Sequence, residues 1–404
     1  MREGLRFDPP PVVFTPEVRW ALLRAFGPPE RVFAQPLDAE VATGLASTLD
    51  LGPRIAARTP LEALQAELGE GGARSLLIAN VKAALITAEI LKCARLVAEA
   101  AAGLSVPVVF LKGVALRLTG VVEEGWRWLS DVDVLAPAGG ARALAEALMS
   151  RGFRSDGVPS QEQHLPPLKR GSLEMVELHN QVLGVRLSSR RRYATLEELQ
   201  ERGLLVPLQE MPGACFVPAR ELLVAHALAH GLAQHGLAPG SYPMTRMLAD
   251  LVDLGLAGPD GARLLDAAHP WIARDVSRDE TGAAMALCAA LTKGDEALFA
   301  PESGRLEAVL LGHVVAGLTD DGYRTALRLA GLWGAPSGHA RPIAWAITAF
   351  HTVFLTRAQV DMIYGRPRTE LGYLGRRLAR PLDLAWRLGR YAASAIRLRL
   401  RRVR

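Results

Sequence analysis

The stretch that decides the fold of this chain is Ser130-Asp131-Val132-Asp133-Val134-Leu135, which follows Phe110-Leu111-Lys112-Gly113 after a short intervening segment. Successive side chains of a strand point to opposite faces, so the pattern places Asp131 and Asp133 on one face of a predicted strand. Like charges held that close are unfavourable unless a cation lies between them. The stretch therefore predicts a divalent-metal site and indicates phosphoryl or nucleotidyl chemistry.

The composition is that of an ordinary globular protein, with 404 residues of which 50% are hydrophobic. A chain of this length can form two or three domains with a sizeable core. Its 47 basic residues are nearly all arginines, so Lys112 beside Gly113 stands out. A lysine is a compact point charge that suits a single phosphate oxygen, although Lys112 could equally be one of a few scattered lysines.

The cysteines and the N-terminal residues lead us to expect a reducing, cytoplasmic location. Cys93, Cys215 and Cys288 lie far apart without paired spacing, which argues against a disulfide framework and against a zinc knuckle. The first residues contain acids and prolines and no apolar export segment. The longest apolar run, from Pro342 to Leu355, is too short to cross a bilayer and contains His351, so we expect no transmembrane span.

The predicted elements change in type along the chain. Apolar residues spaced by three or four predict helices before Gly103 and after Pro218, whereas β-branched runs bounded by glycines predict strands between them. The predictions are helices at 61–68, 74–102, 114–118, 141–151, 221–235, 244–256, 279–291, 306–318, 324–332 and 342–364, and strands at 106–111, 130–135, 165–170 and 174–182.

This order predicts the α+β class. The core is expected to be a small mixed β-sheet in residues 105–216. An N-terminal helical region, 1–104, and a C-terminal helical region with a basic tail, 217–404, are expected to flank it.

The predicted strand at 174–182 carries a third acid. Its alternation places Glu177, His179 and Gln181 on one face. A carboxylate on a strand beside the aspartates would complete a two-metal clamp, and Glu177 is the best placed by pattern. Glu177 could instead be a surface residue, and His179 could orient a carboxylate, contact substrate or be a structural histidine.

Three neighbouring features together predict a site for a triphosphate and metal ions. They are a strand that ends in glycine, a helix that begins directly after it and an acidic strand nearby. Backbone N–H groups of the turn at Gly113 and of the helix N-terminus can hold a triphosphate. Asp131 and Asp133 can bind Mg²⁺ or Mn²⁺ on the phosphates, with Glu177 as a third ligand. In that arrangement a substrate hydroxyl attacks the α-phosphate of an NTP and pyrophosphate leaves.

This pattern resembles the DNA polymerase beta nucleotidyltransferase superfamily, and more closely the uncharacterised nucleotidyltransferase family of bacterial proteins. The segments that carry the resemblance lie between Val106 and Leu254 and are Leu111-Lys112-Gly113, Arg127-Trp128-Leu129-Ser130-Asp131-Val132-Asp133-Val134-Leu135, Val176-Glu177-Leu178-His179 and, more faintly, Ala225-His226. The common Gly-Ser pair of the superfamily is here Gly113-Val114, so Lys112 would supply the phosphate contact in place of a serine hydroxyl.

The resemblance implies a metal-dependent nucleotidyltransferase that transfers an NMP from an NTP to a hydroxyl or phosphate acceptor. The implied catalytic residues, which would also hold the metal ions, are Asp131, Asp133 and Glu177. The implied nucleotide-binding residues are Lys112, Gly113, Arg127, Ser130 and His179. A small-molecule or peptide acceptor is favoured, with RNA as an alternative.

Several charged residues also have a simpler interpretation. Arg127 could meet the triphosphate or pair with Glu123 or Glu124 in its loop. Arg246 and Asp250 are one helical turn apart and predict a helix ion pair, although Arg246 could face the cleft. The histidines His226, His230 and His235 lack the glutamate of a metalloprotease motif, so a zinc site is disfavoured.

The segment from Arg376 to Arg404 contains ten arginines and one acid, Asp383, interleaved with apolar residues. Such a basic amphipathic segment could contact an anionic surface such as lipid or nucleic acid. It could also be a terminal helix whose arginine stems cover apolar surface.

Two other functional classes stay open. A kinase-like phosphotransferase would share the metal but transfer the γ-phosphoryl group, and the sequence has no glycine-rich loop of that kind. A non-catalytic protein of the same fold would only bind a nucleotide or a partner. That class agrees with the missing serine but not with the presence of three acids.

Overall fold

The structure is a computed structural model, and it describes residues 14–33, 35–155, 165–179, 182, 194–234, 244–273, 276–300, 305–319, 369–379 and 382. The expected helices at 324–332 and 342–364, residues Gln181 and His235, and most of the tail from Arg376 to Arg404 lie outside these residues.

The chain forms two compact units, each built from separate stretches of sequence. The helical unit consists of the described residues within 1–91, 112–130 and 219–324. The sheet unit consists of those within 92–111, 131–218 and 325–404. The division at 104 and 216 expected from the order of elements stays a prediction.

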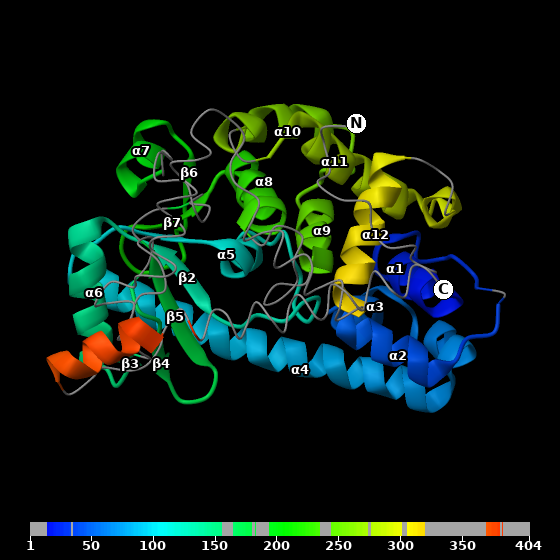
Figure 1. Cartoon of the computed structure of the whole chain (residues 1–404), viewed down its shortest axis with the longest axis horizontal. Coiled ribbons are helices and arrows are strands. Elements are labelled where there is room, and N and C mark those ends of the chain that lie inside the picture. The colour runs from blue at the N-terminus through cyan, green and yellow to red at the C-terminus, as the bar shows by residue number, and fades with distance from the viewer. Residues whose placement is uncertain are drawn as a thin grey trace. The chain divides into compact units, whose positions relative to one another are not determined.

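The described part of the sheet unit is built on a seven-stranded sheet (Figure 1). Its strands are β1 Val108–Phe110, β2 Val132–Leu135, β3 Arg154–Ser155, β4 Leu168–Arg170, β5 Glu174–His179, β6 Leu205–Pro207 and β7 Cys215–Pro218. They lie in the order β3-β4-β5-β2-β1-β7-β6. The pairs β2/β5 and β1/β7 are parallel and the others are antiparallel, so the predicted mixed sheet of the α+β class is confirmed.

The central strands are buried because their sequences are apolar. Each residue of β1 and β2 is buried, as expected for short β-branched runs in the middle of a sheet. The acidic strand is shorter than predicted, because β2 begins at Val132, whose partner on β5 is Val176. Asp131 therefore lies one residue before the strand, and the prediction that both aspartates lie within it is wrong.

Helices of the sheet unit include α6 Ala138–Ser150, α7 Leu196–Glu201 and the last part of α4, from Lys92 to Gly103. Helix α6 packs on β4 and β5. The buried side chains of α6 include Ala141, Leu144 and Leu148, spaced by three and four residues. That spacing forms one apolar face, so the helix predicted at 141–151 is confirmed.

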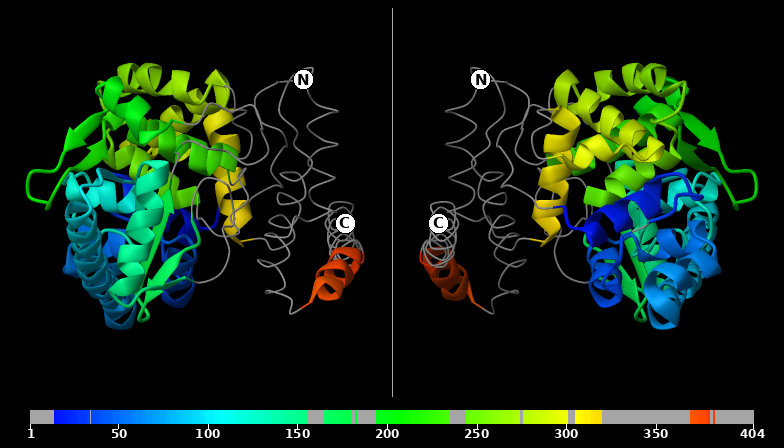
Figure 2. Two further views of the ribbon diagram at one scale, coloured as in Figure 1. Left: turned by 90° about the vertical axis from the view of Figure 1, so that its left-hand side faces the viewer. Right: turned by 90° about the vertical axis from the view of Figure 1, so that its right-hand side faces the viewer.

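The helical unit surrounds its own core of apolar side chains. Its helices are α1 Pro16–Phe26, α2 Ala39–Thr48, α3 Gly52–Arg58, α4 Leu61–Gly103 as far as residue 91, α5 Lys112–Leu118, α8 Arg220–Leu228, α9 Met244–Asp253, α10 Gly261–Ala268, α11 Arg278–Lys293 and α12 Leu306–Thr319. Helix α11 packs against α9, α10 and α12, which are green to yellow in Figures 1 and 2. The helices predicted at 244–256, 279–291 and 306–318 are confirmed with small shifts at their ends.

Local sequence explains how several of these helices begin and end. Helix α11 has a capping box between Ser277 and Glu280, and it ends at Gly294, whose φ is 70°. The two helices predicted before residue 103 form α4, which bends at Gly69, where φ is 68° and ψ is 175°. Only glycine adopts such a conformation without strain.

The helix predicted at 221–235 changes its winding. Helix α8 ends at Leu228, and Ala229–Gln234 form a π-helix. A Cβ at Gly231 would collide with Met247 of α9, so this wider turn runs at very short distance from α9. Single-turn π-helices are frequent near functional sites.

Two predicted absences can be compared with the structure. Cys93, Cys215 and Cys288 are free and buried, which agrees with the expectation of no disulfide framework. Burial raises the pKa of the Cys93 thiol to about 12 and that of Cys215 to about 11. Among the described residues, no helix is long and apolar enough to span a membrane.

Candidate active site

The parallel pairing of β2 with β5 brings the predicted acids of two strands together. In the register of this pair, Asp133 lies opposite Glu177, and Leu135 lies opposite His179. Side chains two residues apart on a strand point to the same face, so Glu177 and His179 both face the side of Asp133. The strand order thus brings Glu177 beside one of the two aspartates.

Short contacts join these side chains within the sheet unit. The Nε2 atom of His179 lies 2.9 Å from Oδ1 of Asp133 and 3.8 Å from Oε2 of Glu177. An ionised carboxylate can only accept a hydrogen bond, so the tautomer of His179 that has its proton on Nε2 can donate a hydrogen bond to Asp133. Asp133 is 2% exposed and His179 is 8% exposed. The histidine therefore fixes the direction of a buried carboxylate.

The same side chains have the donor atoms of a divalent-cation site. Asp133, Glu177 and His179 each offer a ligand atom, and these atoms lie within 4.8 Å of one another. Ligands of one ion at about 2.1 Å lie about 3.0 Å apart when adjacent and about 4.2 Å apart when opposite. Carboxylate oxygens suit Mg²⁺ and Mn²⁺, and an imidazole is also accepted by Mn²⁺. The donor set fits such an ion.

Asp131 and Ser130 lie where the chain passes from the helical unit to the sheet unit. Asp131 is half-buried in the sheet unit, and Ser130 is exposed in the helical unit. Among the described residues, the group of ligand atoms around Asp133 does not include Asp131. The roles predicted for Asp131 and Ser130 stay predictions.

The turn after β1 differs from the predicted glycine turn. The residue with a left-handed backbone is Lys112, with φ 49°, and not Gly113. This conformation is uncommon for a residue with a side chain, and among the described residues Asp50 and Ser105 also adopt it. Gly113 is needed for space, because a Cβ there would lie 2.6 Å from Cδ2 of Leu129 and 3.2 Å from Nη2 of Arg127.

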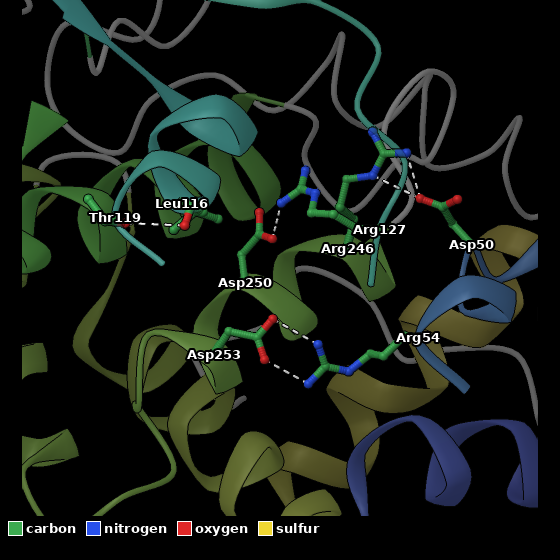
Figure 3. Close-up of polar contacts among 8 residues, drawn as sticks. All are labelled: Asp50, Arg54, Leu116, Thr119, Arg127, Arg246, Asp250 and Asp253. Carbon is green, nitrogen blue, oxygen red and sulfur yellow. Dashed lines mark hydrogen bonds and ion pairs between the residues drawn. The ribbon is translucent and has the colours of Figure 1, made fainter. Parts of the chain in front are cut away.

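Arg127 contacts a residue far away in the sequence (Figure 3). Its Nη1 donates to Oδ1 of Asp250 on α9, and both side chains are largely buried. Burial raises the pKa of the Asp250 carboxyl, and the Arg127 guanidinium opposes this by favouring the ionised form. The sequence predicted a triphosphate or a neighbouring acid of its loop as the partner of Arg127, and Asp250 is neither of these.

Two further charged residues of α9, Asp253 and Arg246, each contact a residue of opposite charge. Asp253 accepts two hydrogen bonds of 2.7 Å from Arg54 of α3. Arg246 donates from Nε to Oδ2 of Asp50 at 2.8 Å, as Figure 3 shows. Residues 246, 250 and 253 are spaced by four and three, so they share one face of the helix. Sequence reasoning missed Asp253 and Asp50, although the four-and-three spacing was a visible signal.

Of the predicted histidines, His226 lies in α8 and His230 lies in the π-helix that follows it. The rings of His226 and His230 lie 6.1 Å apart at an angle of 85°. Within the described residues, the group that could hold an ion contains Asp133, Glu177 and His179 and neither of these histidines. The expectation that these histidines hold no zinc stays a prediction.

Comparisons with known proteins agree with the resemblance of the motifs. The family described as uncharacterised nucleotidyltransferase matches residues 35–276, which is more than half of the chain. A search of curated proteins found no match.

One similar solved structure is the solution structure of the antibiotic-resistance factor ANT(2'')-Ia. It has a TM-score of 0.32 and 14% identity, and the match covers 48% of this chain and 94% of that one. Nothing about the activity of this chain follows from a likeness this low.

Proposed function

Because the chain belongs to the uncharacterised nucleotidyltransferase family, we propose that it transfers an NMP from an NTP to a hydroxyl or phosphate acceptor. The observation that carries the proposal is the pairing of β2 with β5. It sets Asp133 opposite Glu177 with the His179 imidazole 2.9 Å from the aspartate. Two carboxylates on adjacent strands are the ligands that nucleotidyl transfer requires for a divalent cation.

Each acid has a role in this proposal. Asp133 and Glu177 hold Mg²⁺ or Mn²⁺, and Asp131 adds a further carboxylate from the residue before β2. When bound, the ions polarise the α-phosphate and offset the charge of the leaving pyrophosphate. His179 acts through Asp133, because its Nε2 atom lies within hydrogen-bond distance of that carboxylate.

The chemical step conserves atoms and charge. The acceptor hydroxyl loses its proton, and Glu177 is the residue that we propose accepts it. A bond forms between the acceptor oxygen and the α-phosphorus, and the bond from that phosphorus to the pyrophosphate oxygen breaks. A phosphate acceptor would react in the same way without the loss of a hydroxyl proton.

Four residues of the motif segments are proposed to bind the triphosphate. We propose that Lys112 contributes a point charge and Arg127 a planar guanidinium, and that Gly113 allows close approach of the backbone. Ser130 lies in the motif and can donate from its hydroxyl. A left-handed conformation at Lys112 supports a functional role, because such strain is retained when it serves the site.

The acceptor that we propose is a small molecule or a peptide. The helices around the motif segments would shape its binding site, as helical appendages to a small sheet commonly do. RNA is the alternative acceptor, supported by the arginines between Arg376 and Arg404. The tail could also contact an anionic surface.

The experiment that tests the function uses ATP labelled at the α or the γ position, with Mg²⁺ or Mn²⁺ and cell extract as the source of acceptor. Transfer of the α label supports nucleotidyl transfer. Transfer of the γ label alone would establish a kinase-like activity, and binding without transfer of either label would establish a binding protein. The variant Asp133→Asn is the control, and unchanged transfer in it would overturn the site.

A further inference from the structure

Three successive residues of the loop between α5 and β2 are each anchored by a side chain of the helical unit. The Gly125 carbonyl accepts a hydrogen bond of 2.9 Å from Nδ2 of Asn80. The Trp126 ring lies 5.1 Å from the Arg54 guanidinium carbon. Arg127 donates to Asp250. The loop that leads into the acidic motif is therefore attached to α3, α4 and α9.

Helix α9 holds this loop in two ways. Asp250 contacts Arg127 directly, whereas Asp253 accepts two hydrogen bonds from Arg54, whose guanidinium carbon lies over the Trp126 ring. The direct contact also fixes the Arg127 guanidinium close to the turn after β1. The Arg127 guanidinium has one amino group, Nη1, at Asp250, and its other amino group, Nη2, would lie 3.2 Å from a Cβ at Gly113.

The Arg127 guanidinium thus lies between Asp250 and the backbone of Gly113. Both of its neighbours limit where it can move, because Gly113 is buried and the Asp250 side chain is 8% exposed. A buried carboxylate that binds one amino group of a planar guanidinium sets the direction of the other. Loss of that carboxylate would remove the contact that directs Nη2 toward Gly113.

We propose that Asp250 is a positioning residue, which holds the Arg127 guanidinium against Gly113 in the orientation that receives a phosphate group. This inference rests on the proposed function, because it takes Arg127 as a phosphate contact of the NTP. Asp250 lies outside the motif segments and 123 residues from Arg127. It would not touch substrate and would act only through the arginine.

The test compares Asp250→Asn with the matched control Asp50→Asn in the full chain. Both changes remove a carboxylate that pairs with an arginine, and both pairs involve α9, since Asp50 pairs with Arg246. Binding is measured at equilibrium with inorganic tripolyphosphate and Mg²⁺, and separately with ATP and Mg²⁺. Thermal unfolding of each variant reports its stability.

We expect Asp250→Asn to weaken tripolyphosphate binding about 10- to 100-fold, as for loss of one charge-assisted hydrogen bond. Asp50→Asn is expected to lower the melting temperature without changing this affinity. Asp250→Glu, which keeps the carboxylate, should recover part of the lost affinity. In turnover, the effect of Asp250→Asn should appear in KM for ATP more than in kcat.

Equal affinities in Asp250→Asn and the unchanged chain would overturn the proposal, and so would equal losses in Asp250→Asn and Asp50→Asn. If Asp250→Asn does not fold, Arg127→Lys takes its place, because lysine keeps the charge but loses the planar fork. Retained tripolyphosphate affinity in Arg127→Lys would then overturn the proposal. The unchanged chain separates this inference from the proposed function. If only the proposed function is wrong, the unchanged chain binds tripolyphosphate but transfers no α label.

Discussion

The acids of the sheet unit and those of the helical unit have different basic partners. In the sheet unit, Asp133 and Glu177 lie beside the imidazole of His179. In the helical unit, Asp250 and Asp253 contact guanidinium groups of arginine. Both sets are largely buried, so the difference does not arise from exposure to solvent.

The chemistry of the partner explains what each set can do. A guanidinium stays protonated and binds both oxygens of a carboxylate, so it completes the charge balance of a buried acid. An imidazole can release its proton, and it leaves carboxylate oxygens available for a cation. Pairs of the first kind support a rigid frame, whereas the second arrangement suits an ion site. The predictions below test this distinction.

The largest effect is expected for Arg54→Met in the helical unit. Asp253 would keep its buried charge without the two hydrogen bonds of 2.7 Å that it now accepts. We expect the free energy of unfolding to fall by about 3–5 kcal/mol, measured by denaturant unfolding. Arg95→Met is the control, because its pair with Glu99 is exposed and its loss should cost less than about 0.5 kcal/mol. Similar losses in both variants would contradict the rigid-frame interpretation.

In the sheet unit, Asp133→Asn should affect activity more than stability. Removal of a cation ligand is expected to lower α-label transfer by more than about 100-fold, or about 2.7 kcal/mol. Asp260→Asn provides the comparison, since the Asp260 side chain is 74% exposed. The assignment fails if Asp133→Asn retains transfer while its melting temperature is unchanged.

A smaller effect is expected for His179→Gln, which removes the imidazole but keeps an amide. Because His179 directs the Asp133 carboxylate, we expect Mn²⁺ to bind about 10- to 100-fold more weakly. Electron paramagnetic resonance of the free Mn²⁺ measures this directly and needs no substrate. Unchanged Mn²⁺ affinity would mean that the histidine is only a packing residue.

The smallest effect concerns Glu174, at the other end of β5 from His179. The hydrogen bond from Arg170 lowers the pKa of the Glu174 carboxyl below its usual 4.5. The folded chain therefore binds this proton less tightly than the unfolded chain. The stabilisation is present above pH 4.5 and is lost as the pH falls through the lowered pKa.

Glu174→Gln should therefore lower the free energy of unfolding by less than about 1 kcal/mol at pH 7, since the pair is partly exposed. The difference from the unchanged chain should shrink as the pH falls below 4.5. Urea unfolding at pH 7 and at pH 3 provides the measurement. A difference that grows toward low pH would have the wrong sign for this pair.

The sequence was a good guide to the central strands of the sheet, whereas β3, β6 and β7 were not predicted. The runs around Val109 and Val134 are β-branched and end at turn residues, and both form buried strands. The alternation of Glu177 and His179 also placed both side chains on one face correctly. These features depend on residues that are close together in the sequence, so they can be predicted from it.

The partners of charged residues could not be predicted in the same way. The spacing of Arg246 and Asp250 predicted a pair within one helix. In the structure, Arg246 donates to Asp50, and Asp250 accepts from Arg127. A glycine turn was predicted after β1, whereas the residue with the left-handed backbone is Lys112. For the ion pairs, the partner comes from a segment that is distant in sequence.

The sequence by itself determined the mixed α+β character, the acidic motif and the strand that carries Glu177 and His179, because hydrophobic periodicity and turn residues act locally. Only the tertiary structure decided that β5 lies next to β2, with Asp133 opposite Glu177. It also decided that Asp250 is the partner of Arg127. Strand order and buried ion pairs depend on which distant segments share a core. Local sequence patterns do not predict which segments these are.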